Sequence, residues 1–245
     1  MERISYLFKG WVKSIATAGI MAVVLGFSTM ASAQMSGSYT IDKNGAATAV
    51  NFKSYASAVQ ALRGVARSDG GPSLGGGVNG PVTISVVPGS GPYTEQVILT
   101  AITGSSAVNR ITFDGNGERL EFNASSSTNT GVIQVNGADY ITFHDINVKT
   151  LNATYARGFW IYGGADYIIV EDCEIDITSS TSTSAGFSCG IALVGSSTSA
   201  TSYTTGGVKG IGNIYRNNEI YGSSSNNGMN SGIVINGNSS MVNLN

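Results

Sequence analysis

The amino-acid sequence predicts an all-β fold, and three observations support this prediction. Only 11% of the 245 residues are charged, against about 25% in an average domain, so Ser, Thr, Asn and Gly must supply most of the polar surface. These residue types, with 33 glycines, favour turns and short strands because Gly adopts positive φ freely and Ser, Thr and Asn bond to their own backbone. The third observation is a repeat: the tetrapeptide ADYI occurs at 138–141 and again at 165–168.

The first 33 residues have the pattern of a secretory signal peptide. Arg3, Lys9 and Lys13 precede an uncharged run at 15–27, and Ala-Ser-Ala follows at 31–33. This order of basic, apolar and small residues is typical of export signals. The apolar run is shorter than the ~20 residues that cross a bilayer. We therefore expect cleavage after Ala33, a secreted or cell-surface protein, and no membrane span in the mature chain.

The charge of the remaining chain disfavours a nucleic-acid partner. Without residues 1–33, 10 basic residues stand against 14 acidic ones, a net charge of −4. Binding to a phosphate backbone requires a basic stripe or patch. The composition does not indicate an oligomeric state.

Residues 34–80 are predicted to form an amino-terminal region with a strand and a capping helix. Apolar residues at helical spacing place this helix at 52–67, where it would cover the end of the following strands and their open edges. The glycine-rich segment 69–81 then ends the helix. Val82, Ile84 and Val86 alternate as a first strand.

Residues 81–245 are predicted to form the coils of a solenoid. Two further, degenerate copies of the ADYI unit begin at Gly190 and Gly232, and the polar loops between them grow along the chain. Each unit contains short strands and cannot bury its apolar face alone, so the units must stack. A propeller blade needs four strands and about 40 residues. The 27-residue spacing of the ADYI copies therefore favours a right-handed parallel β-helix, whose coils we expect to continue past residue 245.

Alignment of the copies predicts columns of equivalent residues, about 4.8 Å apart. Gln134 aligns poorly with Ile161 and Leu193, which predicts a bulge or a shift in register there. The predicted columns are Val148, Ile175 and Ile220, and Ile146 and Cys173, all facing inward; Tyr140 on Tyr167; Asp145, Asp172 and Asn217; and an outward column in which Glu171 lies between His144 and Arg216.

The sequence contains few residues that could form disulfides or bind metals. Cys173 and Cys189 could form a disulfide in an exported protein, but Cys173 aligns with a core position and favours a buried free thiol. His144 is the only histidine, so neither a zinc nor a redox motif is present. The stacked Asp145 and Asp172 could bind calcium or could accept hydrogen bonds from turn N–H groups. We expect no other cofactor.

The segment GPVTISVVPGSGPYTEQVILTAITG (80–104), between the YASAVQAL helix and NRITFDGNG, resembles the amino-terminal part of pectinesterase-like and pectate-lyase-like β-helix proteins. It is most similar to large exported β-helix proteins of the Bacteroidota, which often carry a sorting domain for type IX secretion. The resemblance covers most of residues 36–245 and implies the fold more specifically than the function, because one fold hosts many activities.

The chain lacks the catalytic patterns that this resemblance implies. The pectinesterase setting of two aspartates with arginine and glutamine is not found, nor are the polygalacturonase elements. The acidic run at 171–176 is scattered by strand alternation. We therefore assign no catalytic and no metal-binding residue.

Three functions remain open. The favoured hypothesis is an adhesin-like module that binds glycans or other cell-surface material through polar loops at 178–188, 195–207 and 222–232. Trp160, Tyr162 and Tyr167 are its candidate sugar platforms, with burial in the core as the alternative, and Arg157 could pair with an acidic sugar or be a solitary surface charge. The second hypothesis is a polysaccharide lyase or pectinesterase-like enzyme with its active site mostly beyond residue 245. The third is a structural spacer.

Overall fold

The computed structural model describes residues 33–182, 186–195, 198, 210–222 and 231–236. Within these residues the chain forms seventeen strands and one helix, and all pairings between the named strands are parallel, which confirms the all-β prediction. The predicted signal peptide and much of the three polar loops lie outside the described residues. No described helix has the length and apolar character needed to cross a membrane.

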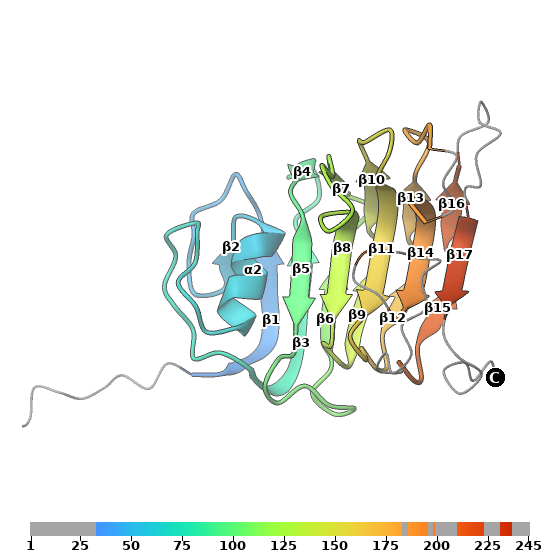
Figure 1. Cartoon of the computed structure of the whole chain (residues 1–245). Coiled ribbons are helices and arrows are strands. Elements are labelled where there is room, and N and C mark those ends of the chain that lie inside the picture. Colours follow the sequence, from blue (N-terminus) through green and yellow to red (C-terminus); the bar gives the residue numbers. More distant parts are fainter. Residues whose placement is uncertain (1–32, 183–185, 196–197, 199–209, 223–230, 237–245) are drawn as a thin grey trace, which may run out of the picture. The chain divides into compact units, whose positions relative to one another are not determined.

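The first of three parallel sheets runs along the whole stack (Figure 1). Its register aligns residues of the same kind, such as Ile111 with Ile141 and Phe113 with Phe143. In spatial order it contains β15 (Ile214–Arg216), β12 (Ile169–Glu171), β9 (Ile141–His144), β6 (Ile111–Asp114), β3 (Val78–Val86), β1 (Met35–Ile41) and β2 (Asn51–Phe52).

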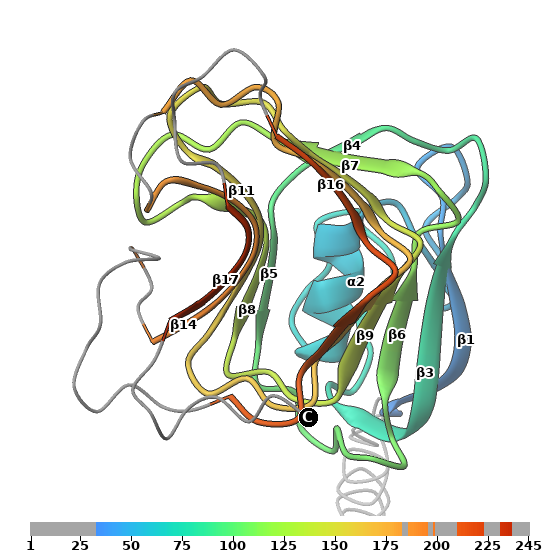
Figure 2. The ribbon, with the colours of Figure 1, turned by 90° about the vertical axis from the view of Figure 1, so that its right-hand side faces the viewer.

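The second and third sheets have five strands each, and each strand neighbours the strand three positions later in the chain. The second sheet contains β16 (Glu219–Tyr221), β13 (Glu174–Asp176), β10 (Asn147–Thr150), β7 (Arg119–Phe122) and β4 (Tyr93–Thr94). The third contains β17 (Ser231–Asn236), β14 (Ser188–Val194), β11 (Ala156–Tyr162), β8 (Gly131–Asn136) and β5 (Val97–Thr100). Viewed along the stack, the three sheets face a common interior (Figure 2).

The interior is filled by the predicted apolar columns. Val148 pairs with Ile175 and Ile175 with Ile220; the first two are buried and the third is partly buried against the same core. Ile146 and Cys173 are buried as predicted. Each such aliphatic side chain contributes about 1.5–3 kcal/mol when it leaves water, so the repeated rungs supply most of the stabilisation.

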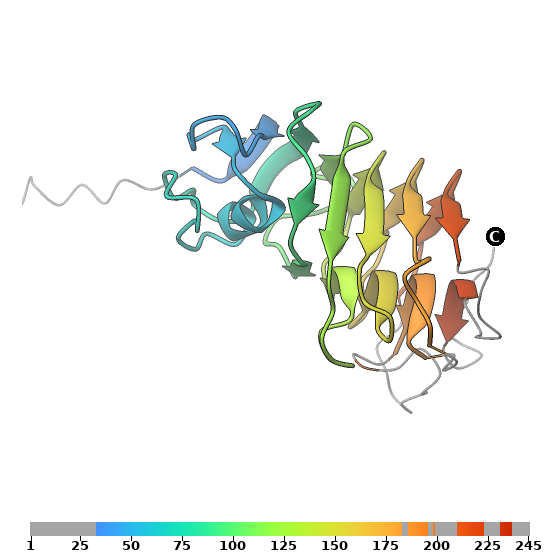
Figure 3. The same ribbon diagram turned by 90° about the horizontal axis from the view of Figure 1, so that it is seen from above.

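Helix α2 (Tyr55–Leu62) lies beyond the first rungs, at the amino-terminal end of the stack (Figure 3). It is shorter than the predicted 52–67. Ser54 caps its first turn by accepting from the Ser57 amide, and Phe52 belongs to β2 instead. Gly64 ends the helical spacing at φ +68, where a Cβ would meet the Gly76 backbone at 2.9 Å. The apolar spacing alone did not reveal these ends.

Two carboxylates fix this end of the chain. Glu95, next to β5, accepts hydrogen bonds from the Tyr55 and Ala56 amides at 2.9 Å, so a negative charge lies at the helix amino terminus, where the helix dipole favours it. Asp69 forms a buried ion pair of 2.6 Å with Arg67. Arg67 also lies over the Phe52 ring, 4.5 Å from its centroid.

The repeated tetrapeptide forms an aromatic ladder at the turns between the third and first sheets. Tyr140 and Tyr167 stack at 4.6 Å with an interplanar angle of 11°, as predicted. Both have left-handed backbones, with φ of 57° and 56°. Gly212 follows on the next rung at φ 65°, and a Cβ there would lie 2.4 Å from Tyr167 Cδ1.

The predicted irregularity at Gln134 is confirmed as a one-residue shift in register. Gln134 pairs with Trp160 rather than with Ile161, and Gly131 pairs with Arg157 rather than with Gly158. The sequence alignment of the two glycines was therefore wrong by one residue, although the ADYI turns align as predicted.

The aromatic ladder gives a stability prediction. Gly212→Ala should destabilise the protein by at least about 1 kcal/mol more than Gly89→Ala, because an added methyl group at 212 must displace the Tyr167 ring. Gly89 also has positive φ (79°), but nothing lies within 4 Å of its Cβ position, so only the left-handed strain of ~1 kcal/mol remains. Urea unfolding of both variants measures the difference, and equal midpoints would contradict a tightly packed ladder.

Candidate functional site

The outer face of the third sheet carries a distinct set of side chains. Alternate residues of its strands enter the core, and others face outward; two of the outward columns lie side by side in register. The register places them as follows: the first outer column is Ile98, Gln134, Trp160, Ala192 and Val234, and the second is Thr100, Asn136, Tyr162, Val194 and Asn236. None of these ten residues is charged, so these two columns differ from the ion-paired outer faces of the other sheets.

Trp160 is completely buried. It belongs to a second apolar cluster, separate from the main core, with Cys189, Ala192 and Val194. The Arg157 guanidinium carbon lies 3.8 Å from its ring centroid, and its indole Nε1 has no hydrogen-bond partner. Burial was the alternative to a sugar platform, and in this structure the ring offers no free face to a ligand.

Tyr162 lies on the same face and remains partly exposed. It packs against the cluster around Trp160, and its hydroxyl donates a long hydrogen bond of 3.5 Å to Gln134 Oε1. Burial raises the pKa of its phenol. Asn136, its neighbour on β8, is exposed. Of the three predicted platforms, Tyr162 is the one that combines partial exposure with an adjacent exposed amide, that of Asn136, whereas Gln134 is buried.

Tyr167 lies elsewhere, on the turn before β12. Tyr140 covers one face of its ring, and Gly212 approaches so closely that a Cβ would overlap ring atoms. Stacking of a sugar requires an open ring face, so Tyr167 serves the scaffold. The structure thus brings Trp160 and Tyr162 together and separates Tyr167 from them.

Arg157 is buried rather than a solitary surface charge. Its Nη1 donates to Thr130 Oγ1 at 2.5 Å, and its Nη2 donates to the carbonyls of Gly186 and Thr198. The sequence interpretation missed this burial because the two carbonyls come from connections between distant strands. An arginine inside the apolar-rich strand ARGFWIY was the signal that could have indicated it.

The predicted aspartate column lies at the turns between the first and second sheets. Asp145, Asp172 and Asn217 all have left-handed backbones, with φ of 48°, 55° and 55°. Asp and Asn tolerate this conformation better than most residues, which explains the column without a ligand. The sequence suggested two alternatives for these aspartates, calcium binding and hydrogen bonds from turn N–H groups. Neither took the left-handed backbone into account.

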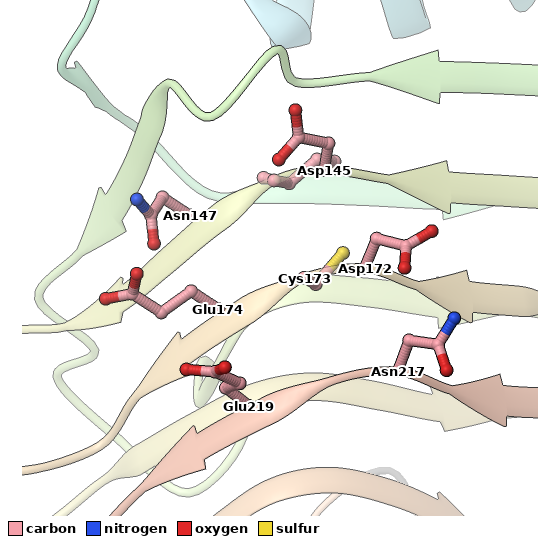
Figure 4. Close-up of a pocket in the computed structure, with 8 residues that line it drawn as sticks. Asp145, Asn147, Asp172, Cys173, Glu174, Asn217 and Glu219 are labelled. Carbon is pink, nitrogen blue, oxygen red and sulfur yellow. The ribbon is translucent and has the colours of Figure 1, made fainter.

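A hollow of about 350 Å³ opens beside this column (Figure 4). It is lined by Asp145, Asn147, Asp172, Glu174 and Glu219, together with Ile146, Cys173 and Asn217. Among the described residues, no group of three or more His, Cys, Asp or Glu has a geometry that could hold a metal ion. Calcium at Asp145 and Asp172 stays a prediction.

The residues of the predicted charge column align in register, but only Arg216 pairs with Glu171, and His144 has other partners. Glu171 lies between His144 and Arg216 on neighbouring strands, and Arg216 donates to it at 2.7 Å. His144 instead lies 3.2 Å from Asp114 and 3.6 Å from Asp172. These partly exposed pairs contribute at most about 1 kcal/mol each.

Comparisons with known proteins identify no relative of the chain: no family model, no curated protein and no solved structure matches it. The functional interpretation therefore depends on the residues and geometry above.

Both cysteines are free and buried, and burial raises the pKa of Cys173 and of Cys189 to about 12. We predict that neither reacts with a disulfide reagent such as DTNB at pH 8 in the native protein, since the thiolate is the nucleophile. Both should react after unfolding in urea. Because each folded pKa is raised, the associated stability is complete below the ordinary thiol pKa and is lost as pH rises towards 12.

Val108→Cys supplies the control for access, since Val108 is 78% exposed and its replacement should react at once. Rapid native reaction of Cys173 or Cys189 would contradict the burial, and absence of free thiols after unfolding would show a disulfide.

Proposed function

We propose that the described strands form a right-handed parallel β-helix. The support is the strand order: from β3 onwards, each sheet takes one strand from each successive unit and pairs it in parallel with the strand three positions later, while β1 pairs with β2 and β3. A chain that passes through three sheets in turn and then repeats is a solenoid. Helix α2 acts as the cap that such a stack needs at its first rung.

We further propose that this β-helix is a secreted or cell-surface module that binds glycans, without chemistry of its own. The observation that carries the proposal is the partly exposed Tyr162 beside the exposed Asn136 amide, with the buried Gln134 accepting a hydrogen bond from the Tyr162 hydroxyl. Aromatic rings provide apolar contact for the C–H face of a sugar, and amides hydrogen-bond its hydroxyl groups. Ligand sites commonly combine such apolar contacts with a few polar groups.

The direction of the columns suggests how a glycan chain would lie. The outer columns run across the strands, so successive rungs present Thr100, Asn136 and Tyr162 in line. A polymer along this line would meet one polar or aromatic side chain on each of three rungs. Because each contact is weak, affinity would come from several sugar units together.

The lyase or pectinesterase hypothesis remains a weaker alternative. It requires an acid and base set on coils beyond residue 245, and nothing among the described residues favours it over binding. The spacer hypothesis explains the low overall charge and the Ser- and Thr-rich loops equally well, but it does not require a partly exposed tyrosine beside an exposed amide.

Tyr162→Ala tests the binding proposal. On a glycan array, we expect the variant to lose about tenfold in affinity for the glycans that the native chain binds, because an aromatic contact contributes ~1 kcal/mol or more. Tyr221→Ala is the matched control: Tyr221 is 44% exposed on β16, in the second sheet, and its loss should leave binding unchanged.

Equal losses in the two variants would refute a site on the third sheet. The native chain's failure to bind any glycan, also when extended past residue 245, would refute the function itself. Amino-terminal sequencing of the exported protein tests the expected cleavage after Ala33.

A further inference from the structure

Arg157 is the centre of a buried cluster that the glycan proposal does not use. We call Arg157, Trp160, Thr130, Phe187 and Cys189 the Arg157 cluster. The guanidinium lies against the Trp160 ring at 3.8 Å and the Phe187 ring at 5.7 Å. Arg157, Trp160 and Cys189 are completely buried, and Thr130 is 1% exposed.

The cluster holds a positive charge without a carboxylate. All acidic residues of the chain except Glu2 lie in the described residues, and none of them is hydrogen-bonded or ion-paired to Arg157 in the structure. Residues 177–245 contain a single acidic residue, Glu219, which is engaged with Tyr221 on β16. The segments between 183 and 245 that the structure leaves undescribed therefore supply no carboxylate side chain.

The charge persists at neutral pH. Desolvation by burial lowers the pKa of Arg157 to about 10, and the nearby Cys189 and Tyr155 oppose this change. A buried cation is costly unless it is paired and hydrogen-bonded. Arg67, the other buried arginine among the described residues, has such a partner in Asp69 at 2.6 Å.

Two donors in the cluster also lack acceptors. The Nε of Arg157 and the Nε1 of Trp160 are buried and have no hydrogen-bond partner. Most buried donors in native proteins are satisfied. The Nε of Arg67 also lacks a partner, but its charge is paired with Asp69; at Arg157 the unsatisfied N–H groups coincide with an unpaired charge, and this combination indicates an acceptor with negative charge.

We infer that the Arg157 cluster binds a small oxyanion, such as sulfate or a carboxylate group. The anion would accept from Arg157 and Trp160 and would neutralise the guanidinium. The Gly186 and Thr198 carbonyls are neutral, whereas an anion also attracts the charge of the guanidinium, strongly so in a buried site of low dielectric, so the anion can compete with the carbonyls for the same donors. This inference stands independently of glycan binding, because it concerns a buried cation and not the exposed Tyr162.

The experiment uses Trp160 as its reporter. The chain has two tryptophans, Trp11 and Trp160, so the full chain with Trp11→Phe has a single indole, in contact with Arg157. We titrate sodium sulfate at constant ionic strength, balanced with sodium chloride, and record the fluorescence. We expect a saturable change that Arg157→Met abolishes.

Arg110→Met is the matched control. Arg110 also lies over an aromatic ring, Tyr140, at 5.7 Å, but it belongs to the turn before β6 and not to the cluster. This variant should keep the saturable response. An unsaturable response, or equal responses with and without Arg157, would overturn the inference, because sulfate also stabilises proteins non-specifically.

Arg157→Lys covers the case in which Arg157→Met does not fold. Lysine keeps the charge but lacks the planar fork and the Nε donor, so we expect the sulfate midpoint to rise at least tenfold; an unchanged midpoint would contradict an arginine-based site. Glucuronate and glucose then distinguish the source of the anion. A response to glucuronate but not glucose indicates a sugar-borne carboxylate, a response to sulfate alone indicates a free ion, and no response to either anion refutes the site.

Discussion

From β3 onwards, the pairing of each strand with the strand three positions later is the constraint on which the rest of the structure depends. It places residues of successive units directly beside one another, so any property of one residue is repeated along a column. For apolar residues this is favourable, as in the column from Val148 to Ile175. For charges it is not, because like charges on neighbouring strands repel. Some charged neighbours have opposite sign, as in the 2.6 Å pair of Lys149 and Asp176, but Glu174 and Glu219 are paired on neighbouring strands with the same sign. The low overall charge keeps such like-charged pairs few.

Turn geometry adds a second constraint at the corners between sheets. Two corner columns require a left-handed backbone, which costs roughly 1–2 kcal/mol for an ordinary residue. The column of Asp145, Asp172 and Asn217 meets this with residue types that tolerate the conformation. Tyr140 and Tyr167 are not residue types that tolerate the left-handed backbone, but stacking of their rings contributes ~0.5–1.5 kcal/mol and offsets much of the cost. The repeated tetrapeptide is therefore a structural element.

Much of this scaffold could be predicted from the sequence, because the repeat itself defines which residues lie beside one another on neighbouring strands. The inward columns, the tyrosine stack and the pairing of Glu171 with Arg216 follow from alignment of the units. The register around Gly131 was missed because Gly163 and Gly164 precede the second ADYI where Gly137 alone precedes the first, so the strand before it is shifted by one residue. The burial of Trp160 and Arg157 was also beyond alignment, because it depends on carbonyls from the connections that contain Gly186 and Thr198. Contacts between non-repeating segments leave no periodic signal.

In the third sheet, the inner columns belong to the scaffold and the outer columns carry the candidate site. Stacking requires each inner column to repeat one class of residue, as Ile133, Phe159 and Ile191 do. The outer positions carry no such requirement, yet they change class at every rung: Ile98, Gln134, Trp160 and Ala192 succeed one another in one column, and Gly131, Arg157, Cys189 and Ser231 in another. A buried arginine and a buried indole with unsatisfied donors reduce the stability of such a scaffold. Since apolar residues would pack there at lower cost, the place where the columns depart from the repeat is where a ligand is to be sought.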